Sequence, residues 1–292
     1  MNVPRNIDAE LTLVIPTLGR ASLRGTLAAV AAGTRWPAQV IVADQGRESW
    51  IGELAAEYRN AGLAVRHLPS TATGRSAGLN LGIAAAATRF VAITDDDCLP
   101  APDWIEGLGE RLRRHDPALV TGRVEAGEGE VQLAVVTSRE EVIQRRPSLR
   151  FDRLSGGNMG MARALWQSLG PFAEQPAMRT AEDGEFAYRA LRAGVPIVYA
   201  PELVVQHLGW RDEPARNTQY ESYGLSQAGF YGHYLRRGDA FILLRVLVHL
   251  LRSSRRWLRG TLHGDHDAAR HGRAQVLGLW PGLRAGWRGG AR

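Results

Sequence analysis

The stretch Arg89-Phe-Val-Ala-Ile-Thr-Asp-Asp-Asp97 joins a short apolar run to three consecutive aspartates. The apolar part has the length and composition of a buried strand. Adjacent carboxylates repel one another, so clustering them costs stability unless positive charge lies among them. A hard divalent cation takes oxygen ligands from one or two carboxylates and from phosphate groups. We therefore expect a metal and phosphate site where this strand ends, although an aspartate run alone is equally typical of a solvated turn.

The chain before this strand alternates between strands and helices. Apolar runs typical of buried strands occupy residues 11–15, 39–43 and 63–68. Helices are predicted between them at residues 22–32, 49–60 and 76–87. This alternation favours a Rossmann-like α/β architecture with a mostly parallel sheet flanked by helices.

Polar residues follow the four predicted strands. They are Thr17, Asp44, Ser70 and Asp95. In open sheets of this kind, ligands bind beyond the carboxyl ends of the strands. One such residue alone would indicate a turn, whereas four at equivalent positions predict a nucleotide site.

The pattern is less regular after residue 102. Helices are predicted at residues 102–115, 164–169 and 182–193, and strands at residues 118–124 and 196–200. Residues 139–153 are charged and weakly periodic, which is typical of a loop or linker, and the signal is helical from residue 217. We predict an α/β domain over residues 1–210 and a helical C-terminal region over residues 211–292.

Three further motifs carry groups suited to binding or catalysis. The segment Gly74-Arg-Ser-Ala-Gly-Leu-Asn-Leu-Gly82 opens a helix whose N-terminus favours phosphate, although its glycine spacing is not that of a dinucleotide site. Glu182 and Asp183 begin another helix. One interpretation is that they compensate the helix dipole, and the other is that Asp183 acts as a general base. His207 is a candidate third metal ligand, with a purely structural histidine as the alternative.

Positive charge is concentrated near the C-terminus. The net charge is +6, every basic residue other than histidine is arginine, and residues 252–292 hold nine arginines and two aspartates. Cys98 is the single cysteine, so an internal disulfide is excluded. Residues 1–11 lack the apolar core of a signal peptide, and no apolar run of about 18 residues is present. These features predict a cytoplasmic protein.

The order and spacing of these motifs resemble those of the family 2 glycosyltransferases, which have the GT-A (nucleotide-diphospho-sugar transferase) fold. The resembling segments are Val14-Ile-Pro-Thr-Leu-Gly-Arg20, Asp44, residues 74–82, residues 95–97, Gly156-Gly-Asn-Met159, Glu182-Asp183 and Val205-Gln-His207. The resemblance implies an inverting enzyme that moves a sugar from a nucleotide-diphosphate sugar to an acceptor hydroxyl. In this family the products are often cell-surface polysaccharides or glycolipids.

The resemblance also implies a role for each matching residue. The nucleotide and the donor would be held by Pro16, Thr17, Arg20, Asp44, Gly74, Arg75, Asn80, Asp95, Asp96, Gly156, Gly157 and Asn158. A divalent metal, Mg²⁺ or Mn²⁺, would be held by Asp97, Asp95 and His207. Asp183, beside Glu182, would be the catalytic base. Two departures leave the nucleotide open. Leu79 stands where many members have arginine, and the sequence leaves open whether Arg75 replaces it. Gln45-Gly46 stands where many members have Asp-Gly-Ser.

Residues 241–259 form an amphipathic helix when drawn at about 100° per residue. One side carries Arg245, His249, Arg252, Arg256 and Arg259, and the other carries Leu243, Leu247, Leu250, Trp257 and Leu258. This pattern is typical of a helix in a membrane interface. A helix that packs its leucines on the catalytic domain and leaves its arginines in water fits equally well. The expected partners are therefore a saccharide or lipid-linked acceptor and, under the first of these two interpretations only, the inner face of a membrane through residues 239–292.

Three other classes of protein agree less well with the sequence. A nucleotidyltransferase of related fold would normally carry an early lysine in a Gly-rich segment, and this chain has no lysine. The basic tail would suit nucleic acid, but the acidic triplet and the nearly neutral remainder do not, so no nucleic acid is expected. A catalytically degenerate scaffold of the same fold is disfavoured by the intact Asp97 and Asp183.

Overall fold

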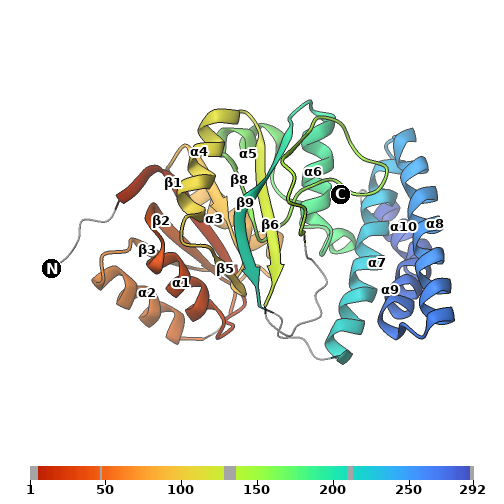
Figure 1. The fold of residues 1–292 in the computed structure, drawn as a ribbon, viewed down its shortest axis with the longest axis horizontal. Helices are drawn as coiled ribbons and strands as arrows, with labels where there is room; N and C mark the ends of the chain where they lie inside the picture. The colour runs from red at the N-terminus through yellow and green to blue at the C-terminus, as the bar shows by residue number, and fades with distance from the viewer. Residues whose placement is uncertain (1–5, 47, 128–135, 209–212, 290–292) are drawn as a thin grey trace. The chain divides into compact units, whose positions relative to one another are not determined.

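The computed structural model describes residues 6–46, 48–127, 136–208 and 213–289 (Figure 1). The chain divides into two compact units. The first comprises residues 1–146, 153–172 and 187–209, and the second comprises residues 147–152, 173–186 and 210–292. The second unit therefore includes two short segments that precede residue 210. The sequence Glu125-Ala-Gly-Glu-Gly-Glu130 is typical of a turn, and residues 128–130 of it lie outside the described residues.

The strands of the first unit form one nine-stranded sheet. They are β1 (Asn6–Thr17), β2 (Arg35–Asp44), β3 (Val65–Pro69), β4 (Phe90–Ile93), β5 (Cys98–Pro100), β6 (Leu119–Ala126), β7 (Val142–Gln144), β8 (Met159–Ala162) and β9 (Ile197–His207). Their order is β3-β2-β1-β4-β8-β6-β9-β5, and β7 pairs with the first residues of β9.

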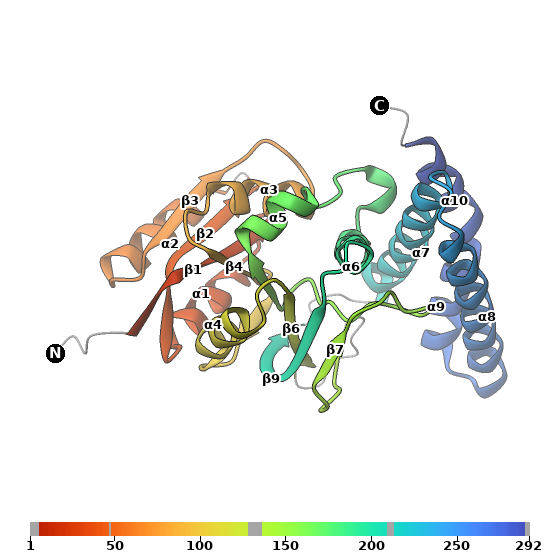
Figure 2. The ribbon, with the colours of Figure 1, turned by 90° about the horizontal axis from the view of Figure 1, so that it is seen from above.

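Helices cover both faces of this sheet. They are α1 (Leu23–Ala32), α2 (Trp50–Asn60), α3 (Arg75–Ala85), α4 (Trp104–His115) and α5 (Arg163–Leu169). A further helix, α6 (Glu182–Arg192), begins in the second unit and ends in the first. Figure 2 shows α3 and α5 on one face of the sheet and α1 and α4 on the other. The predicted α/β class is therefore confirmed.

The sheet is parallel in its first half and mixed in its second half. β3, β2, β1 and β4 run in parallel, as the alternation of strands and helices predicts. β8 runs antiparallel to β4 and β6, and β5 and β7 run antiparallel to β9. Neither β7 nor β8 was predicted, because the Met-Gly-Met-Ala run of β8 lacks β-branched and aromatic residues and β7 lies in the charged stretch.

The glycines of α3 let this helix lie close to β1. A Cβ added at Gly82 would lie 2.4 Å from Val14 Cγ1, and one at Gly78 would lie 3.1 Å from Pro16 Cβ. Contacts this short are not available to larger residues, so glycine at both positions permits the approach. The start of α3 is thereby brought beside the end of β1.

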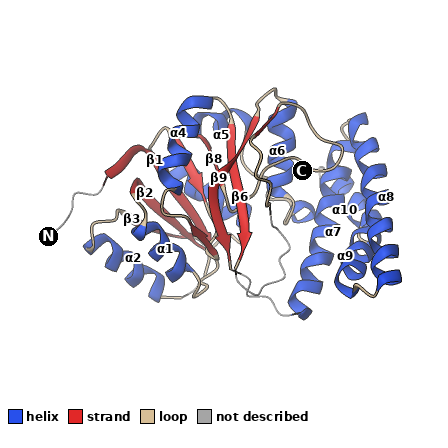
Figure 3. Cartoon of the chain, in the orientation of Figure 1, coloured by secondary structure: helices blue, strands red, loops and turns tan. Residues whose placement is uncertain are grey.

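The second unit is helical in its described C-terminal part (Figure 3). Its helices are α7 (Glu213–Leu235), α8 (Ala240–His263), α9 (His266–Leu277) and α10 (Leu279–Arg288). α7 packs on α10, and α8 packs on α9. A buried ion pair joins Arg245 of α8 to Asp152, with 2.7 Å between Nη2 and Oδ2, and Arg245 Nε donates to the Ser148 carbonyl at 2.7 Å. Within the described part of the chain, no helix combines the length and the apolarity needed to cross a membrane.

Candidate functional site

Polar side chains from three strands meet at one edge of the sheet. Thr17 ends β1, Asp44 ends β2, and Asp95 comes two residues after β4. Thr17 and Asp44 are direct partners in the β1–β2 ladder, and β4 pairs with the other side of β1. Because these strands are parallel, their carboxyl ends lie together. The structure therefore brings these predicted site residues together.

The aspartate triplet is surrounded by positive and hydrogen-bonding groups. Arg20 Nη1 lies 2.8 Å from Asp96 Oδ1, and the Thr17 hydroxyl donates to Asp96 Oδ2 at 2.6 Å. Arg75 Nε donates to Asp95 Oδ1 at 2.7 Å. Burial raises the pKa of Asp96, while the Thr17 hydrogen bond and the Arg20 charge act to lower it. Two arginines thus offset the repulsion expected from three adjacent carboxylates.

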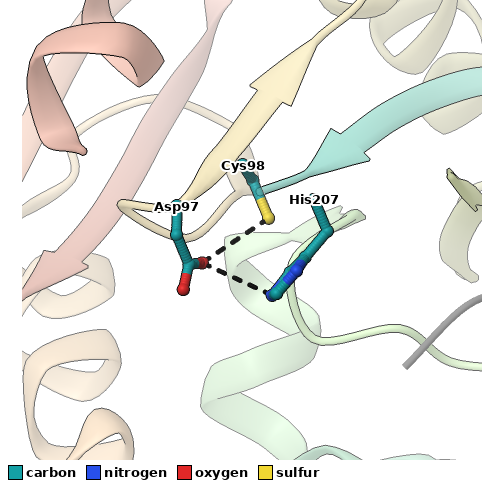
Figure 4. A group of neighbouring side chains, drawn as sticks. All are labelled: Asp97, Cys98 and His207. Carbon is teal, nitrogen blue, oxygen red and sulfur yellow. Dashed lines mark hydrogen bonds and ion pairs between the residues drawn. The ribbon is translucent and has the colours of Figure 1, made fainter. Parts of the chain in front are cut away.

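Asp97, Cys98 and His207 form a cluster at the junction of β5 and β9 (Figure 4). Cys98 is the direct partner of His207 in the β5–β9 ladder. His207 Nε2 lies 3.6 Å from Asp97 Oδ1, and Cys98 Sγ lies 4.0 Å from the same oxygen. The ladder therefore places the histidine against an aspartate that is distant in sequence.

The Asp97 and His207 side chains fit a divalent cation. Bonds of about 2.0–2.2 Å from each would let one ion contact both atoms across the observed separation. The Cys98 thiol is buried, and burial raises its pKa above the ordinary value for cysteine. Thiol ligands suit softer metals than Mg²⁺ or Mn²⁺. Asp95, also predicted as a ligand, lies outside this cluster and pairs with Arg75.

The Gly156-Gly157 loop closes against the aspartates. The Thr94 hydroxyl donates to the Gly157 carbonyl at 2.9 Å. A Cβ added at Gly157 would lie 2.9 Å from Cys98 Sγ and 3.1 Å from Asp95 Oδ2. Glycine is therefore required here by the close approach of the loop to the predicted metal and donor site.

Asn80 and Asn158, both predicted to border the donor, form hydrogen bonds inside the protein through their amides. Asn80 Nδ2 donates to the Phe172 carbonyl at 3.0 Å, and its Oδ1 accepts from the Phe172 N–H at 2.8 Å. Asn158 Nδ2 donates to the Leu203 carbonyl at 2.8 Å, and its Oδ1 accepts from Trp104 Nε1 at 2.8 Å. Both side chains are buried. Their observed role is to hold the loops that carry the site.

His67 is a residue of this site that the sequence did not indicate. Its Nε2 lies 2.8 Å from Asp44 Oδ2, while the Gly46 N–H donates to Asp44 Oδ1 at 2.8 Å. The Asp44 carboxylate is buried and oriented through both oxygens. In the β2–β3 ladder Asp44 pairs with Pro69, two residues after His67 and on the same face. The sequence therefore indicates the contact between His67 and Asp44 only once the register of β2 and β3 is known.

Glu182 and Asp183 lie in the first turn of α6, within the part of that helix that belongs to the second unit. Asp183 is half-buried, whereas Glu182 is buried. Asp183 Oδ1 accepts from the N–H of Gly184 at 2.7 Å. Asp183 is thus the more accessible of the two, and its catalytic role stays a prediction.

Comparison with known families decides the class of this site. The chain matches the model of glycosyl transferase family 2 over residues 12–169, which is more than half of its length. The chain belongs to glycosyl transferase family 2. The matched segment of this family 2 protein contains the strand ends, the aspartate triplet and the Gly156-Gly157 loop, and it ends before Asp183 and His207.

Similar proteins include three bacterial enzymes. Chondroitin synthase of Escherichia coli is 30% identical in an alignment of 224 residues that covers 63% of this chain and 32% of that protein. Hyaluronan synthase of Pasteurella multocida is 26% identical in an alignment of 231 residues that covers 65% of this chain and 24% of that protein. The O-antigen chain rhamnosyltransferase of Salmonella typhimurium is 25% identical in an alignment of 211 residues that covers 68% of this chain and 66% of that protein. This family 2 chain therefore spans about a third of the length of the chondroitin synthase and about a quarter of the length of the hyaluronan synthase.

Solved structures share the fold. The mannosyltransferase of Pyrobaculum calidifontis, in complex with GDP-Man and Mn²⁺, superimposes with a TM-score of 0.62 at 16% identity, covering 98% of this chain and 89% of that one. Residues 1–349 of S. aureus TarS, in complex with UDP-GlcNAc, give a TM-score of 0.58 at 15% identity, covering 93% and 90%. The predicted GT-A fold of this family 2 protein is therefore confirmed.

Proposed function

We propose that this family 2 protein transfers a sugar from a nucleotide-diphosphate sugar to an acceptor hydroxyl, in the synthesis of a cell-surface polysaccharide or glycolipid. The observation that carries the proposal is the meeting of Thr17, Asp44 and the aspartates 95–97 at one edge of the sheet, with His207 beside them. The names of its relatives, two polysaccharide synthases and an O-antigen rhamnosyltransferase, support the same class of product.

The donor would lie across the carboxyl ends of the strands. Asp44, oriented by His67, would accept a hydrogen bond from an N–H group of the base. Arg75 stands at the start of α3, where the helix dipole also favours phosphate. Asp97 and His207 would hold Mg²⁺ or Mn²⁺, and a bound ion would supply positive charge that stabilises the diphosphate leaving group.

The reaction would be a single displacement with inversion. The acceptor oxygen bonds to the anomeric carbon while the bond from that carbon to the diphosphate oxygen breaks, and the electron pair leaves with the nucleoside diphosphate. Asp183 takes the proton of the acceptor hydroxyl. Glu182, which is buried, is left out of this step. The displacement needs no covalent nucleophile, so Cys98 has no catalytic part.

A membrane-bound acceptor would bring this chemistry to a lipid surface. Contact of residues 239–292 with the inner face of a membrane therefore belongs to the same proposal, with a lipid-linked saccharide as one class of acceptor. The basic charge of this region supports it, since anionic lipids attract arginine.

The first experiment is a thermal-shift panel of nucleoside diphosphates with and without Mn²⁺ or Mg²⁺. A ligand that binds the native state at about 100 times its Kd adds about 2.7 kcal/mol of stability. We expect a metal-dependent shift with one nucleotide, its loss in Asp97→Asn, and its retention in Asp103→Asn, an exposed aspartate at the start of α4. No shift with any nucleotide and either metal would contradict the proposal.

A second experiment tests the base. Asp183→Asn should keep the nucleotide-dependent thermal shift and lose about 10²–10⁴-fold in transfer rate. Gly184→Ala, at the next position and with nothing within 4 Å of the added Cβ, serves as the control. Full activity in Asp183→Asn would remove this residue from the mechanism. Nucleotide binding by the native protein without transfer to any saccharide or lipid-linked acceptor would instead favour the scaffold interpretation.

A further inference from the structure

The helices of the second unit pack through their smallest residues. A Cβ added at Gly286 of α10 would lie 1.9 Å from the Gly229 carbonyl oxygen of α7. One added at Gly272 of α9 would lie 2.8 Å from the Ser253 carbonyl oxygen of α8, and one at Gly260 would lie 2.5 Å from a backbone nitrogen of α9. Both helix pairs are therefore in backbone contact, which leaves no room between them for large side chains.

The large apolar side chains of α8 lie outside instead. Six leucines on this helix are between 51% and 71% exposed, and we name them the leucine face: Leu243, Leu244, Leu247, Leu251, Leu258 and Leu262. Their spacing places them on one side of the helix. In a protein surrounded by water, residues of this kind normally form the core, and a contiguous exposed patch marks an interaction site. Helices packed through small residues with leucines outward are typical of lipid surroundings.

This arrangement differs from the helix drawn from the sequence in the placement of two basic residues. Arg245 and His249, predicted on an outward basic stripe, turn inward. Arg245 is buried in its ion pair with Asp152, and burial lowers the pKa of His249 to about 4, so it is neutral at pH 7. Ser253 and Gly260 lie on the packed side of α8. The exposed side of the helix therefore carries leucines as well as arginines.

Positive charge lies along one flank of the leucine face. A pocket of about 400 Å³ between α8 and α9 is lined by arginines and a histidine, namely Arg252, Arg255, Arg256, Arg259 and His263. Among the described residues that line this pocket, the one acidic residue is Asp265, which caps α9 by accepting from the Ala268 N–H at 3.0 Å. The sequence of α8 contains no aspartate or glutamate. The pocket is therefore a cationic site beside an apolar surface.

We propose that the leucine face and this arginine pocket bind the surface of a membrane that contains anionic lipids. The leucines enter the boundary between headgroups and acyl chains, and the arginines contact lipid phosphates. A second copy of the chain is a poorer occupant, because two α8 helices face to face would bring Arg255 and Arg259 of both together without acidic partners on either helix. The inference extends the proposed glycosyl transfer by assigning the surface at which a lipid-linked acceptor is met.

The test is co-sedimentation of the full chain with vesicles of phosphatidylcholine, alone or mixed with phosphatidylglycerol. We expect binding to the mixture that weakens as salt rises. Leu251→Gln and Leu258→Gln should each lower the partition coefficient about tenfold. Arg255→Gln and Arg259→Gln should each lower it about fivefold.

Matched controls come from exposed residues of the first unit. Ile7→Gln, and Arg66→Gln with Arg114→Gln, remove equivalent apolar surface and charge away from α8 and should leave vesicle binding unchanged. The nucleotide-dependent thermal shift should persist in every variant, which separates failure of lipid binding from failure of the proposed activity and also confirms folding.

Two results would overturn the proposal. One is equal binding of the native chain and the leucine variants to anionic vesicles. The other is a dimer in analytical ultracentrifugation that Leu251→Gln dissociates, combined with no vesicle binding, which would make a second copy the occupant of the leucine face.

Discussion

Replacing Gly157 by alanine should strain the site at the point where the Gly-Gly loop meets the aspartates. The new Cβ would lie 2.9 Å from Cys98 Sγ and 3.1 Å from Asp95 Oδ2, whereas unstrained contacts between heavy atoms lie near 3.5–4.0 Å. The loop cannot simply move away, because the Thr94 hydroxyl holds the Gly157 carbonyl at 2.9 Å. Overpacking of this kind costs about 1–3 kcal/mol.

The Cys98 sulfur makes the closest of these contacts, so removing it should relieve the strain. Cys98→Ala alone creates a small cavity and should cost about 1 kcal/mol. In the double variant, Gly157→Ala should cost less than it does in the native background, with a coupling energy of about 1 kcal/mol. Gly184→Ala is the control, since nothing lies within 4 Å of its added Cβ.

The assay is urea unfolding of the native chain, the two single variants and the double variant, followed by the thermal shift with nucleoside diphosphate and metal. Gly157→Ala should also weaken the ligand-dependent shift, because Asp95 must move. Additive unfolding energies, within about 0.3–0.5 kcal/mol, would refute the proposed contact between position 157 and Cys98.

Two other predictions concern the helical unit. Arg245→Ala should lower the free energy of unfolding by about 3–5 kcal/mol, because Asp152 stays buried without its partner. The control is Arg255→Ala at an exposed position, which should change it by less than about 0.5 kcal/mol. Urea unfolding followed by circular dichroism compares the two variants. Burial lowers the pKa of His249 to about 4 from an ordinary 6.5, so the unfolded chain binds this proton first and stability falls as pH drops from 6.5 towards 4. His249→Gln should remove up to about 3 kcal/mol of that loss, and identical pH dependence in the two proteins would contradict it.

Much of the first half of the fold could be predicted from the sequence, because each strand there is a compact apolar run followed by a polar residue. β8 was missed because its residues have little strand propensity and only its neighbours β4 and β6 make it a strand. Asn80 and Asn158 were assigned to the donor because a family motif records which residue stands at a position, but not which way its amide points. Their hydrogen-bond partners, such as Phe172 and Trp104, lie far away in the chain.

The sequence by itself determined where the site would be. Parallel strands joined by crossover helices must bring their carboxyl ends to one edge, so Thr17, Asp44 and the aspartates 95–97 follow from local patterns alone. Only the tertiary structure decided what each side chain contacts: His67 on Asp44, Arg75 on Asp95, and His207 beside Asp97. It also decided that the leucines of α8 face outward, because the small residues Ser253 and Gly260 form the side of that helix that packs on α9. Such contacts depend on strand register and on the distance between elements, and these are set by residues far apart in the chain.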